Sequence, residues 1–272
     1  MSSFAAILRL IWHEVGFRSR LLLASWFGPI SVRKACSQLR KDGFTVIKGY
    51  VPAQLLEELR AACMQSVENF GARDSDGVYW IKKQPGALRL RHLNERQPIL
   101  DLFSRDMFCR SINFLFSGRL GSPSVQFALT HDGSGRYGAI PGAAERTFGD
   151  VYHFDKWYHQ LKAMVPLRDV GPDNGPLTVL PGSSGIHLDL LDVYQLDLFD
   201  RAMKQKRTDR AKSDVQLDDY DVPEEIRSKL REKYGEKKIV AQAGDMVLFD
   251  TRTIHFAGQM QRGERHLLWF YF

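Results

Sequence analysis

The stretch Val151-Tyr152-His153-Phe154-Asp155-Lys156-Trp157-Tyr158 decides how the chain is interpreted, because it sets a histidine and an aspartate two residues apart among aromatic, strand-prone residues. On a β-strand, residues i and i+2 point to the same face, so His153 and Asp155 can reach one metal ion while Phe154 packs on the other side. The pair is a candidate chelate, and its third partner has to come from elsewhere in the chain.

His255 is the candidate for that third ligand. It follows Gly244-Asp245-Met246-Val247-Leu248-Phe249-Asp250, which is typical of a turn followed by a strand. Between the two ligand regions, the Asn-Gly and Pro-Gly pairs of residues 174–183 indicate tight turns around a short apolar strand. Two imidazoles and one carboxylate on one face of an octahedron leave the opposite positions open for substrate and dioxygen, as in a non-haem Fe(II) oxygenase.

With these motifs in this order, the sequence resembles the phytanoyl-CoA dioxygenase-like family of Fe(II)/2-oxoglutarate oxygenases. The resemblance runs from about residue 38 to the C-terminus, and the chain departs from the family pattern at Ser184, where the family often has histidine, and at Ala257 and Gln259. The matching stretches are Leu39 to Tyr50 as an opening helix end and strand, His153-x-Asp155, Asn174-Gly175-Pro176-Leu177 to Pro181-Gly182-Ser183, Gly244-Asp245 leading to His255, and Arg265.

The resemblance implies a fold that is mainly β with added helices (α+β), namely a double-stranded β-helix (a cupin-like jelly roll) with N-terminal helices. It implies that Fe(II), 2-oxoglutarate and O₂ are used together, and that oxidative decarboxylation to succinate and CO₂ is coupled to hydroxylation of a substrate C–H bond. Asp155 implies hydroxylation and not halogenation, because the related halogenases lack this carboxylate so that chloride can take its place.

Arg265 is the candidate partner of the co-substrate. A 2-oxo dicarboxylate that chelates iron leaves its distal carboxylate inside the barrel, and a planar guanidinium satisfies a carboxylate with two parallel hydrogen bonds. Arg262 is the alternative, three residues away. Gly263 indicates a turn beside Arg262, whereas Arg265 opens the apolar strand His266 to Phe272, so the sequence favours Arg265.

Length and composition favour one catalytic domain over residues 35–272. The chain has 272 residues, of which 44% are hydrophobic, enough for a sizeable core. Helices are predicted over 53–70 and 98–116, and a charged helical insertion at about 185–238 contains a helix from Asp221 to Gly235 that serves as a solvated excursion, a substrate lid or an oligomer contact. His159 is either a group that supports the metal ligands or a buried structural histidine.

Three cysteines, Cys36, Cys63 and Cys109, have no metal-like spacing and an odd count, so disulfides are not expected and a reducing cytoplasm fits.

Residues 1–34 form a basic, amphipathic segment. Six bases against Glu14 alone give residues 1–40 a net charge of +5, almost all of the chain's +6. Charges interrupt each apolar run before it could span a membrane, and no signal-peptide cleavage pattern stands out. The segment is therefore either an interfacial helix on anionic lipid or a helix docked on the barrel, and nucleic acid is not an expected partner. Its predicted apolar face consists of Phe4, Ile7, Leu8, Ile11, Trp12 and Val15.

The expected substrate is a lipid or lipid-linked sugar at the membrane surface, and the Kdo hydroxylases of lipopolysaccharide assembly are one such group within the resembling family. A soluble small metabolite is the enzymatic alternative. Two alternatives from other classes stay open, a zinc hydrolase built on the same triad and a non-catalytic membrane-binding jelly roll. The expected location is the cytoplasm, with peripheral attachment to the inner face of the membrane, and the oligomeric state is open.

Overall fold

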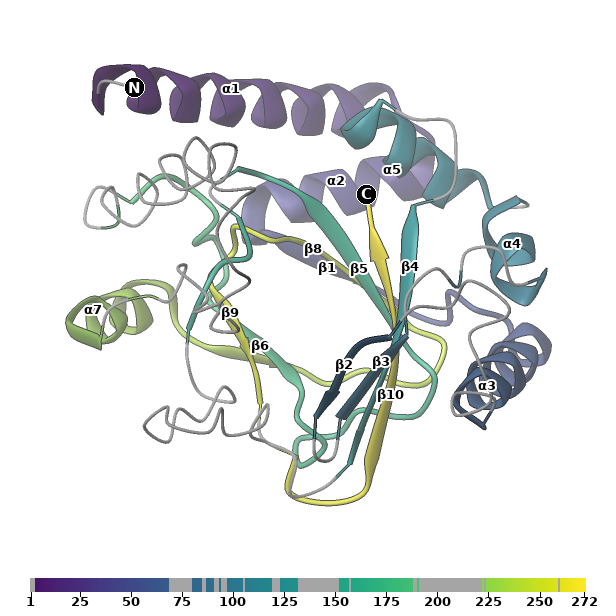
Figure 1. Ribbon diagram of the computed structural model, residues 1–272. Coiled ribbons are helices and arrows are strands. Elements are labelled where there is room, and N and C mark those ends of the chain that lie inside the picture. The colour runs from purple at the N-terminus through teal and green to yellow at the C-terminus, as the bar shows by residue number, and fades with distance from the viewer. Residues whose placement is uncertain are drawn as a thin grey trace, which may run out of the picture.

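The structure is a computed structural model, and it describes residues 3–68, 80–84, 87–90, 93, 97–104, 106–118, 123–131, 152–156, 158–187, 190, 222, 224–258 and 260–272. Two antiparallel sheets face each other, and helices cover the outer side of the larger sheet (Figure 1). This is the jelly roll with N-terminal helices that the sequence predicted.

Strands that are neighbours in the sheets are mostly distant in the sequence, as the jelly-roll topology requires. The larger sheet has the order β1 (Phe44–Ile47), β8 (Met246–Asp250), β5 (Leu161–Pro166), β10 (Glu264–Tyr271), β4 (Ser124–His131), β3 (Ala87–Leu90) and β2 (Trp80–Gln84). The smaller sheet has the order β7 (Lys237–Ile239), β6 (Leu177–Val179) and β9 (His255–Ala257).

Side chains of β10 alternate between two cores, as the pleat of a strand dictates. Leu268 and Phe270 join the core between the larger sheet and the helices. Leu267 belongs to the core between the two sheets, and Trp269 packs against that core. Arg265 has the same parity as Leu267 and Trp269, so β10 carries it on the barrel's interior side.

Six helices are described: α1 (Ser3–Phe27), α2 (Ile30–Asp42), α3 (Ala53–Glu68), α4 (Gln97–Ser104), α5 (Met107–Ser117) and α7 (Glu224–Tyr234). The predicted helices at 53–70 and after Asp221 are confirmed as α3 and α7, and Gly235 follows α7 with φ 68°. Residues 191–221 of the predicted insertion lie outside the described residues.

The prediction of one helix over 98–116 is wrong, because two helices, α4 and α5, occupy this stretch. Asp106 has extended backbone angles (φ −97°, ψ 105°), and its side chain accepts hydrogen bonds from the backbone N–H groups of Phe108 and Cys109. An aspartate in this conformation is an N-cap, which begins a new helix instead of continuing the previous one. Apolar periodicity alone did not reveal the break.

Helix α1 is docked on the rest of the molecule, but not through the face that the sequence predicted. Phe17, Leu21 and Ala24 join the core with α2 and the larger sheet, and Leu10 joins a second core. The side chain of Phe4 lies outside the described residues. No helix among the described residues is long and apolar enough to cross a membrane. The predicted face points outward, with exposed fractions of 51% for Leu8, 46% for Ile11, 79% for Trp12 and 55% for Val15.

Candidate metal centre

The two predicted metal-binding histidines lie directly opposite each other. His153 and His255 form an antiparallel bridge in which each backbone N–H donates to the other's carbonyl at 2.9 Å. The backbone N–H of Asp155 donates to the carbonyl of Thr251 at 3.0 Å, which keeps the next part of the chain aligned. Backbone pairing therefore brings together ligands about a hundred residues apart in the sequence.

The three side chains converge on one point. The Nε2 atoms of His153 and His255 lie 3.8 Å and 3.5 Å from the same oxygen, Oδ1 of Asp155. One nitrogen or oxygen from each residue lies within 4.8 Å of the others. Two imidazole nitrogens and one carboxylate oxygen fit Fe(II), and this donor set occupies one side of an ion while leaving the other side open.

His255 is oriented by its second ring nitrogen. Its Nδ1 donates to the carbonyl of Thr253 at 2.7 Å, which leaves the lone pair on Nε2 directed at the centre. The side chain of His255 is only 5% exposed and lies edge-on to Phe249, whereas that of His153 is 29% exposed. The centre thus has a closed side at His255 and an accessible side at His153.

Asp155 is an ionised carboxylate in this setting. Burial opposes ionisation, but the charge of Lys162 and the nearby ring of His255 hold the pKa of the Asp155 carboxyl well below its usual value. The ammonium of Lys162 lies 3.2 Å from Oδ2, the oxygen that does not face the histidines. Lys162 was not among the site residues predicted from the sequence. Its signal was one charged residue inside the otherwise apolar strand β5.

Arg265 and Arg262 lie in different environments. Arg265 is 7% exposed, and its Nη1 donates to the carbonyl of Gly175. Arg262 has a side chain that is 76% exposed and pairs with Asp173 at 2.9 Å. The structure therefore places Arg265 inside the barrel and Arg262 at the surface.

Gly175 shows why the predicted Asn-Gly turn matters for Arg265. Its φ of +64° lies in the left-handed region, and a Cβ atom there would meet the carbonyl oxygen of Gly258 at 2.6 Å and Nη1 of Arg265 at 2.8 Å. A larger residue at this position would displace the guanidinium, so the turn helps to set the position of Arg265.

A second ionic cluster links α1 to the end of β8. His159 is buried, with Nδ1 2.6 Å from Asp250 and Nε2 2.7 Å from Glu14, and its ring stacks on Phe17 at 4.1 Å. Nη1 of Arg252 donates to Glu14 at 2.6 Å. No described contact joins His159 to the triad. Of the two roles proposed from the sequence, His159 therefore has that of a buried structural histidine and not that of a support for the metal ligands.

Glu14 is held ionised within this cluster. Burial alone would raise its pKa, but hydrogen bonding to His159 and the charges of His159 and Arg252 lower the pKa to about 2. The sequence contained a signal for this role, because Glu14 is the only acid among the first forty residues. A lone acid in a basic helix is a reason to expect a buried partner.

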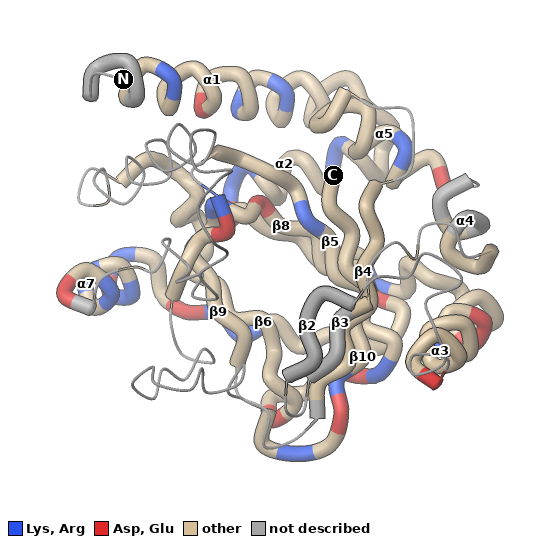
Figure 2. The backbone as a smooth tube through the Cα atoms, viewed as in Figure 1, with Lys and Arg blue, Asp and Glu red and all other residues tan. Residues whose placement is uncertain are grey.

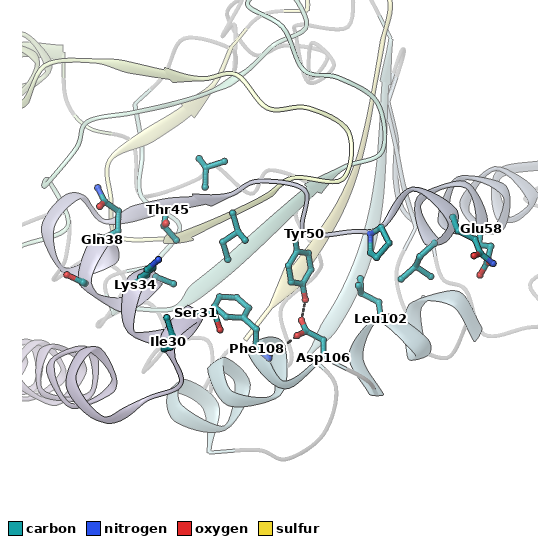
Figure 3. Close-up of a pocket in the computed structure, with 17 residues that line it drawn as sticks. Ile30, Ser31, Lys34, Gln38, Thr45, Tyr50, Glu58, Leu102, Asp106 and Phe108 are labelled. Atoms are coloured by element: carbon teal, nitrogen blue, oxygen red, sulfur yellow. Dashed lines mark hydrogen bonds between the residues drawn. The ribbon is translucent and has the colours of Figure 1, made fainter.

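A cavity of about 1530 Å³ lies away from the triad, between β1 and the helices α2, α3, α4 and α5. Figure 3 shows Tyr50 pointing across it to Asp106, the N-cap of α5. Lys34 and Gln38 of α2 also line it, whereas His153, Asp155 and His255 do not. Cys109 contacts Tyr50 and, like Cys36 and Cys63, is a buried free thiol.

Comparison with known proteins defines the class. The family model for phytanoyl-CoA dioxygenase (PhyH) matches residues 39–266, so the chain belongs to this family. It is accordingly an Fe(II)- and 2-oxoglutarate-dependent dioxygenase, as the resemblance predicted. Ectoine dioxygenase of Sphingopyxis alaskensis is 22% identical over 237 residues, which cover 84% of this chain and 70% of that protein.

Solved structures share the fold at low sequence identity. EctD from S. alaskensis with 2-oxoglutarate and 5-hydroxyectoine has a TM-score of 0.57 at 16% identity, covering 89% of this chain and 76% of that one. AviO1 from Streptomyces viridochromogenes Tue57 has a TM-score of 0.54 at 19% identity, covering 88% and 93%. HygX from Streptomyces hygroscopicus with nickel, 2-oxoglutarate and hygromycin B has a TM-score of 0.51 at 13% identity, covering 88% and 86%. These likenesses establish the jelly roll.

Proposed function

We propose that the enzyme hydroxylates a C–H bond, with His153, Asp155 and His255 as the ligands of Fe(II) and Arg265 as the partner of the distal carboxylate of 2-oxoglutarate. The observation that carries this proposal is the convergence of two imidazole nitrogens on one oxygen of Asp155, at 3.8 and 3.5 Å. In the reaction, one atom of O₂ enters the product alcohol and the other enters succinate, while 2-oxoglutarate loses CO₂.

The protein side chains supply binding and orientation in this scheme. Thr253 fixes the ring of His255, and Arg265 holds the far end of the co-substrate, so that the 2-oxo acid end meets the metal in one orientation. The accessible side, at His153 and Asp155, is where a substrate C–H bond would approach. Iron, when bound, supplies the activation of O₂.

The test of the reaction is 2-oxoglutarate consumption by purified protein with Fe(II) and, in parallel, with Zn(II), together with mass spectrometry of candidate substrates. A product heavier by one oxygen atom that needs both Fe(II) and 2-oxoglutarate supports the proposal. Hydrolysis with Zn(II) and no 2-oxoglutarate consumption would support the zinc alternative instead. Protein that binds no Fe(II) would support the non-catalytic module.

For the substrate, we propose a lipid or lipid-linked sugar at an anionic membrane surface. Among the described residues, eleven large apolar side chains are exposed, and ten of them lie in α1, at the start of α2 or in α5. Figure 1 shows α1 running over α2 and α5 on one side of the molecule. Exposed apolar residues gathered in this way mark an interaction surface. We call this the apolar surface, and its members are Leu8, Ile11, Trp12, Val15, Leu23, Trp26, Phe27, Ile30, Met107 and Phe114.

The charge around the apolar surface favours an anionic bilayer as its partner. Residues 1–40 carry a net charge of +5, and Figure 2 shows basic segments along α1 and α2. A second copy docked on the same surface would bring two such charges together, whereas anionic headgroups would compensate them. Tryptophan on an amphipathic helix, as at Trp12 and Trp26, suits the boundary between headgroups and acyl chains.

An enzyme bound at that surface would act on a molecule with an apolar anchor. Hydroxylation of the Kdo sugar at its 3-position in the lipopolysaccharide inner core is one reaction of this kind. The alternative is a soluble metabolite, favoured by the small molecules named with two relatives, ectoine and hygromycin B. Whether the apolar surface binds lipid decides between a lipid-linked and a soluble substrate.

Flotation with liposomes tests the membrane proposal. Removing α1 would destroy part of the core, so the comparison uses full-length protein and the double variant Trp12→Ser, Trp26→Ser, with Val240→Ser as the control for an exposed apolar residue elsewhere. We expect wild type and Val240→Ser to float with anionic liposomes, less at high salt, and the double variant to remain unbound. Equal behaviour of all three proteins would defeat the membrane proposal and favour a soluble substrate.

A further inference from the structure

Lys162 lies in an unusual place for a lysine. It projects from β5, a strand at the middle of the larger sheet, and its side chain is only 13% exposed. Its ammonium lies 4.4 Å from the ring centre of Trp269, 5.0 Å from that of Tyr271 and 5.9 Å from that of Phe249. Three aromatic rings around a cation form a favourable electrostatic setting and hold it in one place.

Because of the position of this ammonium, the two carboxylate oxygens of Asp155 have different partners. Oδ1 faces both imidazole Nε2 atoms, whereas Oδ2 lies 3.2 Å from the Lys162 ammonium. A charge-assisted hydrogen bond of this kind is stronger than one between neutral groups. The carboxylate therefore presents one oxygen to the centre while the other is already engaged.

We propose that Lys162 is a positioning residue that keeps Asp155 a one-oxygen ligand and so reserves a coordination position for the co-substrate or O₂. This inference rests on the proposed function. An octahedral ion has six positions, and two histidines, one aspartate oxygen, two atoms of 2-oxoglutarate and one O₂ would fill all of them. Carboxylates also bind metals through both oxygens. If Asp155 did so, one of the positions needed for the reaction would be lost.

The experiment uses Mn(II), which does not turn over, as the metal probe. The variants are Lys162→Met, which keeps the length but removes the charge, and Lys162→Arg, which keeps a donor. Lys237→Met is the matched control, because Lys237 also lies over an aromatic ring, Phe44 at 5.2 Å, but on the small sheet's strand β7. For each protein, the measurements are Mn(II) affinity, the number of metal-bound waters from proton relaxation, and the affinity of the Mn(II) form for 2-oxoglutarate.

We expect Lys162→Met to bind Mn(II) at least as tightly as wild type, with one bound water fewer, and to bind 2-oxoglutarate about tenfold more weakly. Lys162→Arg should restore both values, and Lys237→Met should match wild type. Trp269→Leu removes the nearest ring but keeps the lysine. It should lower the mean number of metal-bound waters and the affinity for 2-oxoglutarate, each by less than Lys162→Met does. This variant keeps the proposal testable if Lys162→Met does not fold.

Other outcomes separate the possible failures. An unchanged water number and 2-oxoglutarate affinity in Lys162→Met, with lower thermal stability alone, would make Lys162 a structural residue and overturn the proposal. Weaker 2-oxoglutarate binding with an unchanged number of metal-bound waters would make Lys162 a co-substrate-binding residue and would also overturn the proposal. Failure of wild-type protein to bind Mn(II) and 2-oxoglutarate would instead contradict the proposed function.

Discussion

Two ionic clusters, one at the triad and one at α1, contain the same types of side chain but differ in where their polar atoms point. In the triad, two imidazole nitrogens face a single carboxylate oxygen, and part of the cluster is accessible. In the cluster of Glu14, His159, Asp250 and Arg252, the oxygens contact several different donors, and the last three side chains are only 1–2% exposed.

The difference teaches how a metal centre can be separated from a structural ion network. Polar atoms that converge on one point leave room for an ion and are accessible from one side. Carboxylate oxygens that are each matched by neighbouring donors, as those of Glu14 are by Arg18, His159 and Arg252, leave no common point for an ion. The first arrangement is suited to chemistry, and the second fastens α1 to the barrel.

The largest effect expected is on turnover in the triad. His153→Ala, Asp155→Ala and His255→Ala should each lower the rate of 2-oxoglutarate-coupled oxidation by more than about 100-fold, since even residues that only support metal ligands cost about 10–100-fold when removed. Thermal unfolding of the metal-free His153→Ala and His255→Ala proteins should change little. Asp173→Ala, at a surface ion pair, is the control. Near-wild-type turnover in any of the three variants would remove that residue from the ligand set.

The Glu14 cluster at α1 should show the opposite behaviour, in which stability falls and turnover is nearly unchanged. Glu14→Gln removes the carboxylate that contacts the buried side chains of Arg252 and His159, so we expect the free energy of unfolding to fall by about 3 kcal/mol. Turnover of the folded protein should stay within about twofold. Urea unfolding measures the loss, and Glu57→Gln is the control, because Glu57 has a side chain that is 68% exposed and should cost less than about 1 kcal/mol. Equal losses in both variants would contradict the structural role of the cluster.

The sequence predicted much of the triad's surroundings because local patterns encode them. The His-x-Asp spacing, the Asn-Gly turn at Gly175 and the strand before His255 are all short-range features, and in this order they carry the family resemblance that implied the jelly roll. Gly263 beside Arg262 favoured Arg265 as the co-substrate partner, and in the structure Arg265 is buried in β10 whereas Arg262 is exposed. The role of Arg265 stays a prediction.

The α1 cluster and the contacts of Lys162 could not be predicted in the same way, because they depend on tertiary packing. Glu14 and Arg252 are 238 residues apart, and no local pattern pairs them. The docking face of α1 was also missed, since α1 has apolar residues on two opposite faces and the sequence does not say which one is buried. The break between α4 and α5 depends on a single capping aspartate.

The next largest effect is expected for Arg265, on the requirement for 2-oxoglutarate. Arg265→Ala removes the buried guanidinium, so the 2-oxoglutarate concentration needed for half-maximal rate should rise about 10- to 100-fold while Fe(II) binding is spared. Arg262→Ala, which removes an exposed guanidinium, should leave this concentration unchanged. Steady-state kinetics at varied 2-oxoglutarate distinguishes them. A defect in Arg262→Ala with none in Arg265→Ala would transfer the role to Arg262.

The smallest effect is the pH dependence of the α1 cluster. The pKa of Glu14 is about 2 in the folded protein and 4.5 when unperturbed. A group with a lowered pKa stabilises the folded state above its unfolded pKa, and this stabilisation is lost as the pH falls toward the folded pKa. The stability difference between wild type and Glu14→Gln should therefore shrink by about 1 kcal/mol between pH 6 and pH 4. Urea unfolding of both metal-free proteins across this range measures it. If the difference stayed constant, the carboxylate of Glu14 would not be the ionised partner that fastens α1 to the barrel.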